Sequence, residues 1–516
     1  MFRSAGFEGF SGARFDGQMN EQQFRTEPWR PYLFALVGAV ILSWFLIYNG
    51  WPVFYEDSSA YLSRPGRVLG HAGIPNEWDP FDPSRADPTA ARNFDRVDAT
   101  VVWQGGRSVY YGTMMVLVSV IATSVGIAVL QAILATLAVA IPWFRVGGSW
   151  IGFAALVAVI SAVTGWAVLA ATLTPDIFMP IAILACATLV ALRERLLVLD
   201  RWVLGLILGF CALSHNSILA LLLAASLLAM LACALSPKMR AMMRTFIPIW
   251  ASSVAGLAGL LVYSLTALSV TGKPPLELPH ISARIATSEA GRATLQQNCP
   301  EAGFVVCDYL AQTREGNWID FMFSRDPGKA VFATASIDTK YDLGKEQLSV
   351  LYLVLKERPG AVVAMELQDV VKQIGAFSLT DLDVSGKSQI ASMVSTPTLE
   401  AIRSTASFRD DGMVLQTLST FTVASTITGL LIIAAWVIRR GGMRRLDAVE
   451  QFCAWLLAGV FVNAAICAVL AGVYDRFQAR VVWLVPLAAG FLIYHAFSGR
   501  QALLARSAQT SEAIDG

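Results

Sequence analysis

The feature that most constrains this chain is a series of apolar runs, most of them long enough to cross a membrane, separated by polar loops. A helix of about 20 apolar residues crosses a hydrocarbon core of roughly 30 Å, and the membrane leaves helices and closed barrels as the only spanning structures. Runs of this length predict helices. Because 55% of the residues are hydrophobic and only 15% are charged, the composition excludes a soluble domain and a disordered chain.

We expect an all-α polytopic membrane protein with about ten transmembrane helices. The first run, 31–50, ends in Trp51-Pro52-Val53 instead of a small-residue cleavage site, so we interpret it as a retained anchor. The count is open by one or two, because 109–144 is longer than one span needs. The predicted spans are 31–50, 109–144, 150–170, 177–192, 202–214, 217–235, 246–270, 415–438, 451–472 and 481–498.

Lysine and arginine in short loops indicate the cytoplasmic side of a membrane protein. Alternate short loops are basic, and placing them inside puts both termini in the cytoplasm of a bacterial-type inner membrane. The basic residues are Arg193, Arg195, Arg201, Lys238, Arg240, Arg244, Arg439, Arg440, Arg444 and Arg445. The predicted division is a cytoplasmic segment 1–30, a membrane module 31–270 with an external loop 51–107, an external (periplasmic) domain 271–414, the last three spans 415–498 and a cytoplasmic tail 499–516.

The external domain is predicted to be small, mostly helical and placed against the membrane. Amphipathic spacing indicates helices over about 345–357 and 361–377. Cys299 and Cys307 are eight residues apart in this domain, where an oxidising compartment permits a disulfide. Two reduced, buried thiols are the alternative.

Two adjacent acids, Glu56 and Asp57, follow the first span by a few residues. A carboxylate here suits a general base, or a ligand for a divalent ion and phosphate. The alternative is structural, because an acid before Ser58-Ser59 is an ordinary N-cap arrangement. A third acid, Asp176 in Thr174-Pro175-Asp176, enters a predicted span, where acids are functional, paired or capping.

Polar residues also mark other external turns. His215 and Asn216 form the tip of an otherwise apolar hairpin, which suggests a phosphate or sugar partner or else an ordinary turn. The loop before the last span contains Asp475, Arg476 and Arg480, with the two arginines four residues apart on one helical face. Arginine suits bidentate phosphate binding, although snorkelling to the interface is the alternative.

Arg107 follows Gly105-Gly106 where the first external loop re-enters the membrane, and the two glycines let backbone approach a ligand closely. The predicted topology brings all these residues to the outer membrane face. We therefore expect one site there.

This arrangement resembles the glycosyltransferase-C superfamily of membrane enzymes that use lipid-linked sugars. The resemblance covers roughly residues 31–235 and rests on the cytoplasmic N-terminus, the extended first external loop with the Glu56-Asp57 pair, and Asp176. It implies that Asp57 is the catalytic base. His215, Arg476 and Arg480 are similar to phosphate-holding residues by location only, and His215 stands where related transferases often have a lysine.

The function implied by the resemblance is sugar transfer from a polyprenyl-phosphate-type donor to a glycan, lipid or protein acceptor. A divalent cation, Mg²⁺ or Mn²⁺, is an optional cofactor, and no residue cluster has convincing metal-ligand spacing. A flippase or exporter, or a polymerase of lipid-linked glycans, would bind the same phosphate without this use of the acid. The net charge of +1 gives no indication of a nucleic-acid partner.

Overall fold

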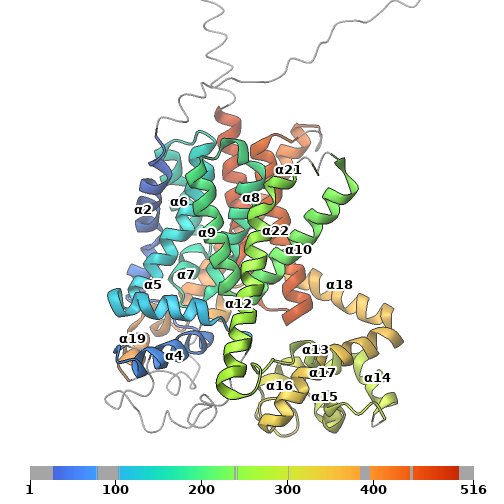
Figure 1. Ribbon diagram of the computed structural model, residues 1–516. Helices are drawn as coiled ribbons and strands as arrows, with labels where there is room; N and C mark the ends of the chain where they lie inside the picture. The colour runs from blue at the N-terminus through green and yellow to red at the C-terminus, as the bar shows by residue number, and fades with distance from the viewer. Residues whose placement is uncertain are drawn as a thin grey trace, which may run out of the picture.

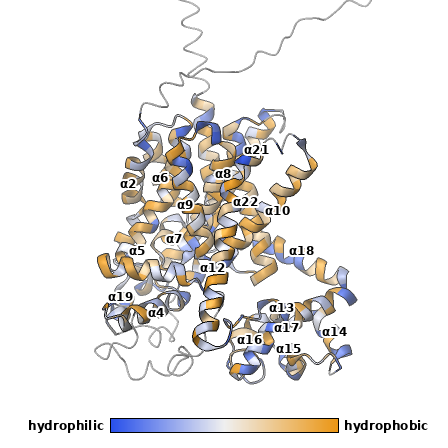
Figure 2. Cartoon of the chain, in the orientation of Figure 1, coloured by the Kyte–Doolittle hydropathy of each residue, from blue (hydrophilic) through white to orange (hydrophobic). Residues whose placement is uncertain are grey.

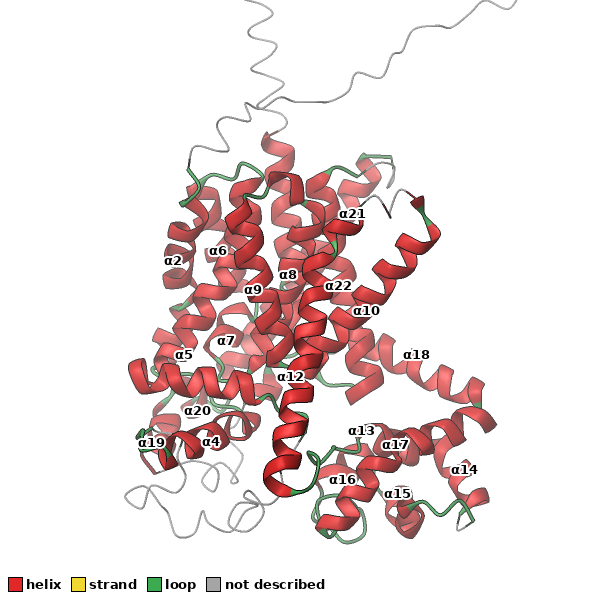
Figure 3. Cartoon of the chain, in the orientation of Figure 1, coloured by secondary structure: helices red, strands yellow, loops and turns green. Residues whose placement is uncertain are grey.

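The protein is built from helices. The computed structural model describes residues 27–76, 78, 103, 105–237, 240, 242–299, 301–383, 396–441 and 446–498. It is 80% helical, and the described part has no strand (Figure 3), which confirms the predicted all-helical class. The predicted terminal segments, apart from residues 27–30, and most of the first external loop, including 79–102, lie outside the described residues.

Every predicted span is helical, and seven helices are long and apolar enough to cross a membrane. The other three are shorter: 150–171 is divided at Thr164 and Gly165, 178–191 has 14 residues, and 198–214 has 17. The count of ten therefore stays a prediction. The helices are α2 (Arg30–Leu42), α3 (Trp44–Asn49), α5 (Val109–Arg145), α6 (Trp150–Val163), α7 (Trp166–Ala171), α8 (Phe178–Ala191), α9 (Val198–Ser214), α10 (Asn216–Leu235), α12 (Ile247–Thr271), α21 (Met413–Arg439), α22 (Ala448–Ala471) and α23 (Asp475–Val482), which begins the last span, Asp475–Ser498.

The long apolar run 109–144 is not one straight span. Helix α5 is interrupted at Ala122 and Thr123, and Thr123 has a φ of 56°, which is rare for a β-branched residue. The part before this break runs across the end of the bundle, nearly at right angles to the spans in Figure 1. It packs on α4 (Glu56–His71), where Gly112 lies so close to the Tyr61 carbonyl that a side chain would collide with it. The first segment of α5 thus brings Arg107 next to the start of α4.

A second hydrophobic core lies beside the bundle at the end marked by α4. It is formed by residues between Leu276 and Val362 and is separate from the bundle core. Residues 276–375 are called the inserted unit below, and Cys299 and Cys307 form a disulfide in it. Its helices are α13 (His280–Thr287), α14 (Glu289–Asn298), α15 (Leu310–Glu315), α16 (Trp318–Phe323), α17 (Ile337–Glu357) and α18 (Pro359–Gly375). Figure 2 shows a more mixed polarity in this unit than in the bundle.

The predicted external domain 271–414 does not share one core. Leu379, Leu382 and Ile402 pack into the bundle core instead, and the Ser407 amide donates a hydrogen bond to Asn49 at the end of α3. Leu379 directly precedes η6 (Thr380–Leu382), and the residues after it belong to η6, α19 (Thr396–Ser404) and α20 (Ala406–Arg409). The chain therefore returns to the bundle after α18, before the span α21 begins.

The opposite end of the bundle is fastened by a buried ion pair. Arg145 at the end of α5 forms two hydrogen bonds with Asp200 in α9, at 2.6 and 3.0 Å. Tyr32 of α2 donates a third hydrogen bond to the same carboxylate at 2.9 Å. A buried charge is tolerated when it is paired and hydrogen-bonded. The Asp200 carboxylate therefore fixes the ends of α2, α5 and α9 relative to one another.

Candidate functional site

Asp57 lies in the first turn of α4 and is held by two arginines from distant parts of the chain. One carboxylate oxygen, Oδ1, is 2.5 Å from Arg107, and the other, Oδ2, is 2.9 Å from Arg476. The helix begins at Glu56, two residues earlier than the Ser58-Ser59 start considered from the sequence, so Asp57 is not its N-cap. The capping position is Tyr55, whose backbone amide donates a hydrogen bond to Ser58 Oγ at 3.0 Å.

The charge state of this carboxylate is fixed by its neighbours. Burial favours the neutral form of Asp57, but Arg107 and Arg476 outweigh burial and hold the Asp57 pKa well below its usual range. Burial likewise opposes the charge on Arg107, and Asp57 outweighs it and raises the Arg107 pKa. The Asp57 side chain is 20% exposed. It is therefore an ionised carboxylate that still reaches the surface.

A second ion pair lies deeper. Asp176 is in η2 (Pro175–Ile177), where the Thr174 hydroxyl donates to its Oδ2 at 3.0 Å. Arg480 is fully buried and contacts Asp176 Oδ1 at 3.1 Å. Its Nη2 also donates to Ser217 and Asn463, at 3.1 and 3.0 Å. Within the described part of the chain, Arg480 Nε is buried without a hydrogen-bond partner.

The two ion pairs are neighbours because Arg476 and Arg480 lie on successive turns of helix α23. The Phe477 ring centroid lies 5.4 Å from the guanidinium carbon of each arginine, so both cations contact the same ring. The Tyr55 ring lies 4.4 Å from the Arg476 guanidinium, a distance suited to a cation–π contact. The predicted side-by-side placement of the two arginines is thus realised within one cluster.

His215 joins the cluster through Ser217. It separates α9 from α10, and its Nδ1 accepts a hydrogen bond from the Ser217 amide at 3.1 Å. Ser217 Oγ lies 2.8 Å from this nitrogen and accepts the hydrogen bond from Arg480. The polar hairpin tip therefore positions Arg480, whereas the adjacent Asn216 is exposed.

Not every predicted residue faces the arginines. Asp475 accepts a hydrogen bond from the Ser378 backbone instead. Glu56 lies in the same turn as Asp57 and is only partly buried. The residues that the structure brings together are Asp57, Arg107, Asp176, His215, Arg476 and Arg480.

Several members of the cluster were missed in the sequence. Asn463 is an amide in the middle of an apolar span, a pattern that marks intramembrane polar contacts and was a usable signal. Asp381 accepts a hydrogen bond from the Arg476 amide, and His280 of the inserted unit feels the charges of Arg107 and Asp57. Neither has a local signal, because both come from loops or short helices that only the fold brings here.

The cluster brings three guanidinium groups together around buried and partly buried carboxylates. The ion-paired set has three guanidinium groups, Arg107, Arg476 and Arg480, against two carboxylates, Asp57 and Asp176. Asp381, whose carboxylate accepts a hydrogen bond from the Arg476 amide, adds a third carboxylate, so the formal charges of this wider set balance. Among the described residues, no three acids, histidines or cysteines approach closely enough to hold a metal ion.

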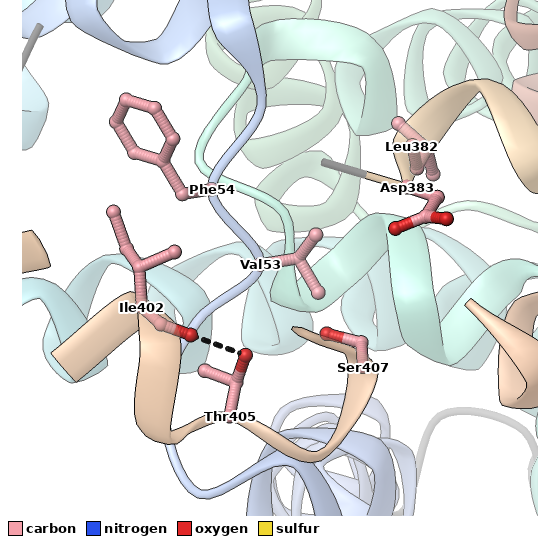
Figure 4. Close-up of a pocket in the computed structure, with 7 residues that line it drawn as sticks. All are labelled: Val53, Phe54, Leu382, Asp383, Ile402, Thr405 and Ser407. Atoms are coloured by element: carbon pink, nitrogen blue, oxygen red, sulfur yellow. Dashed lines mark hydrogen bonds between the residues drawn. The ribbon is translucent and has the colours of Figure 1, made fainter. Parts of the chain in front are cut away.

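A small cavity lies close to the start of α4. It is lined by Val53 and Phe54 and by residues that follow the inserted unit, as Figure 4 shows, and holds only about 10 Å³. A single water molecule already needs roughly that volume. This cavity is therefore too small for a sugar or a phosphate group.

Comparison with known protein families, with curated proteins and with solved structures found no match.

Proposed function

We propose that the protein is a membrane glycosyltransferase that moves a sugar from a polyprenyl-phosphate-type donor to a hydroxyl-bearing acceptor. The observation that carries this proposal is the contact of one surface-reaching carboxylate, Asp57, with two arginines. A carboxylate can take the proton of an acceptor hydroxyl, and arginines can hold the departing phosphate. The distribution of basic loops supports the outer face of an inner membrane as the place of reaction.

In the proposed reaction, Asp57 removes the proton of the acceptor hydroxyl as its oxygen attacks the anomeric carbon. A new carbon–oxygen bond forms, and the bond between that carbon and the donor phosphate breaks. The electron pair leaves with the phosphate oxygen, and because the acceptor oxygen attacks from the face opposite the phosphate, the anomeric configuration is inverted. Arg107 and Arg476 stabilise the charge that develops on the phosphate. A phosphate leaving group needs no strong general acid, and a bound Mg²⁺ or Mn²⁺ would add Lewis-acid assistance.

The two ion pairs of Asp57 give donor binding a second role. A carboxylate with a depressed pKa is a weak base, and here each oxygen already faces an arginine. A donor phosphate competes for these arginines. When they turn toward it, burial is less well compensated and the Asp57 pKa rises, so the base becomes effective only when the donor is present.

A second candidate is a flippase or exporter of lipid-linked glycans, and the same double ion pair favours it. In that function Asp57 would only orient Arg107 and Arg476 for phosphate. The two functions differ in what the carboxylate must do. A transferase needs it as a base, whereas a binder needs only the positions of the arginines.

The Asp57→Asn variant separates these candidates. Farnesyl phosphate binding to the purified protein is measured in detergent, and transfer is measured with a panel of short polyprenyl-phosphate hexoses and hexosamines. We expect transfer to be lost, because an amide takes no proton. Phosphate binding should be unchanged or tighter, because the arginines lose their competitor.

The matched control is Asp338→Asn, the same chemical change at an 84% exposed carboxylate of the inserted unit. It should leave both measurements unchanged. Full transfer by Asp57→Asn would refute the base assignment. Phosphate binding that weakens together with transfer would instead assign Asp57 the role of a positioning residue.

A further inference from the structure

His280 is the residue of the inserted unit that faces the ion-paired cluster. It is the first residue of α13, and it lies close enough to Arg107 and Asp57 to interact electrostatically with both. Burial, reinforced by Arg107, lowers the pKa of His280 to about 4, so the ring is neutral at pH 7. Its Nδ1 is buried and has no hydrogen-bond partner among the described residues. A neutral ring can serve a hydroxyl as donor or acceptor.

Aromatic side chains continue from His280 toward the loop that carries Arg476. The His280 and Trp318 ring centroids are 6.2 Å apart, and Trp318 meets Tyr474 edge-to-face at 5.3 Å. All three side chains are partly exposed. Trp318 also lies against Gly472, where any side chain would collide with the indole ring and where the φ is +96°. Only glycine allows this approach without strain.

Backbone contacts hold this surface in register with the membrane bundle. The buried Gln373 carboxamide of α18 accepts from the Tyr474 amide at 2.9 Å and donates to the Tyr474 carbonyl at 2.7 Å. On the other side, Gly105 and Leu276 form a backbone hydrogen bond of 2.7 Å. The inserted unit is thus fastened to both loops that supply arginines to Asp57.

We propose that His280, Trp318 and Tyr474 form the acceptor subsite of this enzyme and that it takes a sugar ring, so that the acceptor is a glycan. This inference rests on the proposed function and narrows its acceptor. The subsite is a junction between the inserted unit and the bundle, with Asp57 next to it on the bundle side.

The chemistry of the three side chains favours a sugar over a charged or purely apolar ligand. A sugar ring has a face of C–H groups that packs on aromatic rings and a rim of hydroxyls that need hydrogen bonds. Trp318 and Tyr474 offer the aromatic surface, and the partly exposed His280 ring, whose buried Nδ1 has no hydrogen-bond partner among the described residues, lies beside Trp318. A glycan bound there presents a hydroxyl beside Asp57, as the proposed transfer requires.

The test is direct binding of the purified full-length protein, in detergent, to a printed array of oligosaccharides containing hexoses, hexosamines and uronic acids. The wild type should bind a subset of these glycans. Trp318→Ala should lower the apparent affinity for that subset by about tenfold or more, which corresponds to roughly 1.4 kcal/mol. His280→Ala should lower it as well, and it carries the test if Trp318→Ala fails to fold.

The matched control is Tyr352→Ala, which removes a 67% exposed aromatic ring on α17. It should bind the array like the wild type. The proposal is overturned if the wild type binds no glycan, if Trp318→Ala and His280→Ala bind like the wild type, or if a peptide array is bound at this surface instead. Because no transfer is needed for this readout, glycan binding without any transfer activity would reject the proposed function and leave the sugar-binding surface in place.

Discussion

Removing the charge of Arg480 should destabilise the protein strongly, and removing the charge of Asp176 as well should restore much of the loss. Arg480 is 0% and Asp176 3% exposed, and they are 3.1 Å apart. In Arg480→Met, the buried Asp176 carboxylate loses its ion-pair partner and keeps the Thr174 hydroxyl and the nearby charge of Arg476. Breaking a buried pair costs about 3–5 kcal/mol when the remaining charge is uncompensated, and because Arg476 still compensates part of the Asp176 charge, we expect a loss near the lower end of that range.

The double variant Arg480→Met with Asp176→Asn leaves neither charge. It still loses the hydrogen bonds from Arg480 to Ser217 and Asn463, each worth roughly 0.5–1.5 kcal/mol. We therefore expect it to be more stable than Arg480→Met alone. Contacting residues show interaction energies of about 0.5–3 kcal/mol in a double-mutant cycle, and a buried pair belongs in the upper half of that range.

The assay is the free energy of unfolding of all four proteins in lipid bicelles, under conditions where unfolding is reversible. The same cycle on Lys273 and Asp338, an exposed pair at 3.0 Å, is the control and should give no resolvable coupling. Equal coupling in the two cycles, or a double variant less stable than Arg480→Met, would refute the assignment of a buried, mutually dependent pair.

Three further predictions concern the cluster, the inserted unit and the orientation. Arg107→Met should move the acid limb of the transfer activity to higher pH, because the Asp57 pKa is depressed chiefly by Arg107 and burial then acts with less opposition. Replacing Cys299 and Cys307 together by Ser should destabilise the inserted unit by about 2–3 kcal/mol, as expected for a loop of this length, and protease resistance of the unit measures it. Asp338→Cys should react with an impermeant thiol reagent on intact cells.

Each has a result that would contradict it. An unchanged acid limb in Arg107→Met would show that the protonation of Asp57 does not set it. If the double Ser variant resists the protease as well as the wild type does, the disulfide does not contribute to the stability of the inserted unit. Glu194→Cys, in the basic loop at η3 (Arg193–Arg195), is the control for the Asp338→Cys labelling and should react with the reagent only after lysis. The reverse pattern would invert the topology.

The sequence by itself determined the helical membrane class and the places of the apolar helices along the chain. Apolar length and loop charge are local properties, so they can be summed along the chain without knowing the fold. The same local view recognised Asp57, Asp176, Arg476 and Arg480 as unusual, because a charge next to an apolar run is costly unless it has a partner. It did not identify the partners.

Only the tertiary structure decided those partners. Arg476 and Asp57 are 419 residues apart and Arg480 and Asp176 are 304 apart, so no spacing along the chain relates them. The break in α5 and the approach of His280 also depend on packing between distant segments. Short-range physics places each charge at one end of a helix, and the long-range fit of the helices selects which charges meet.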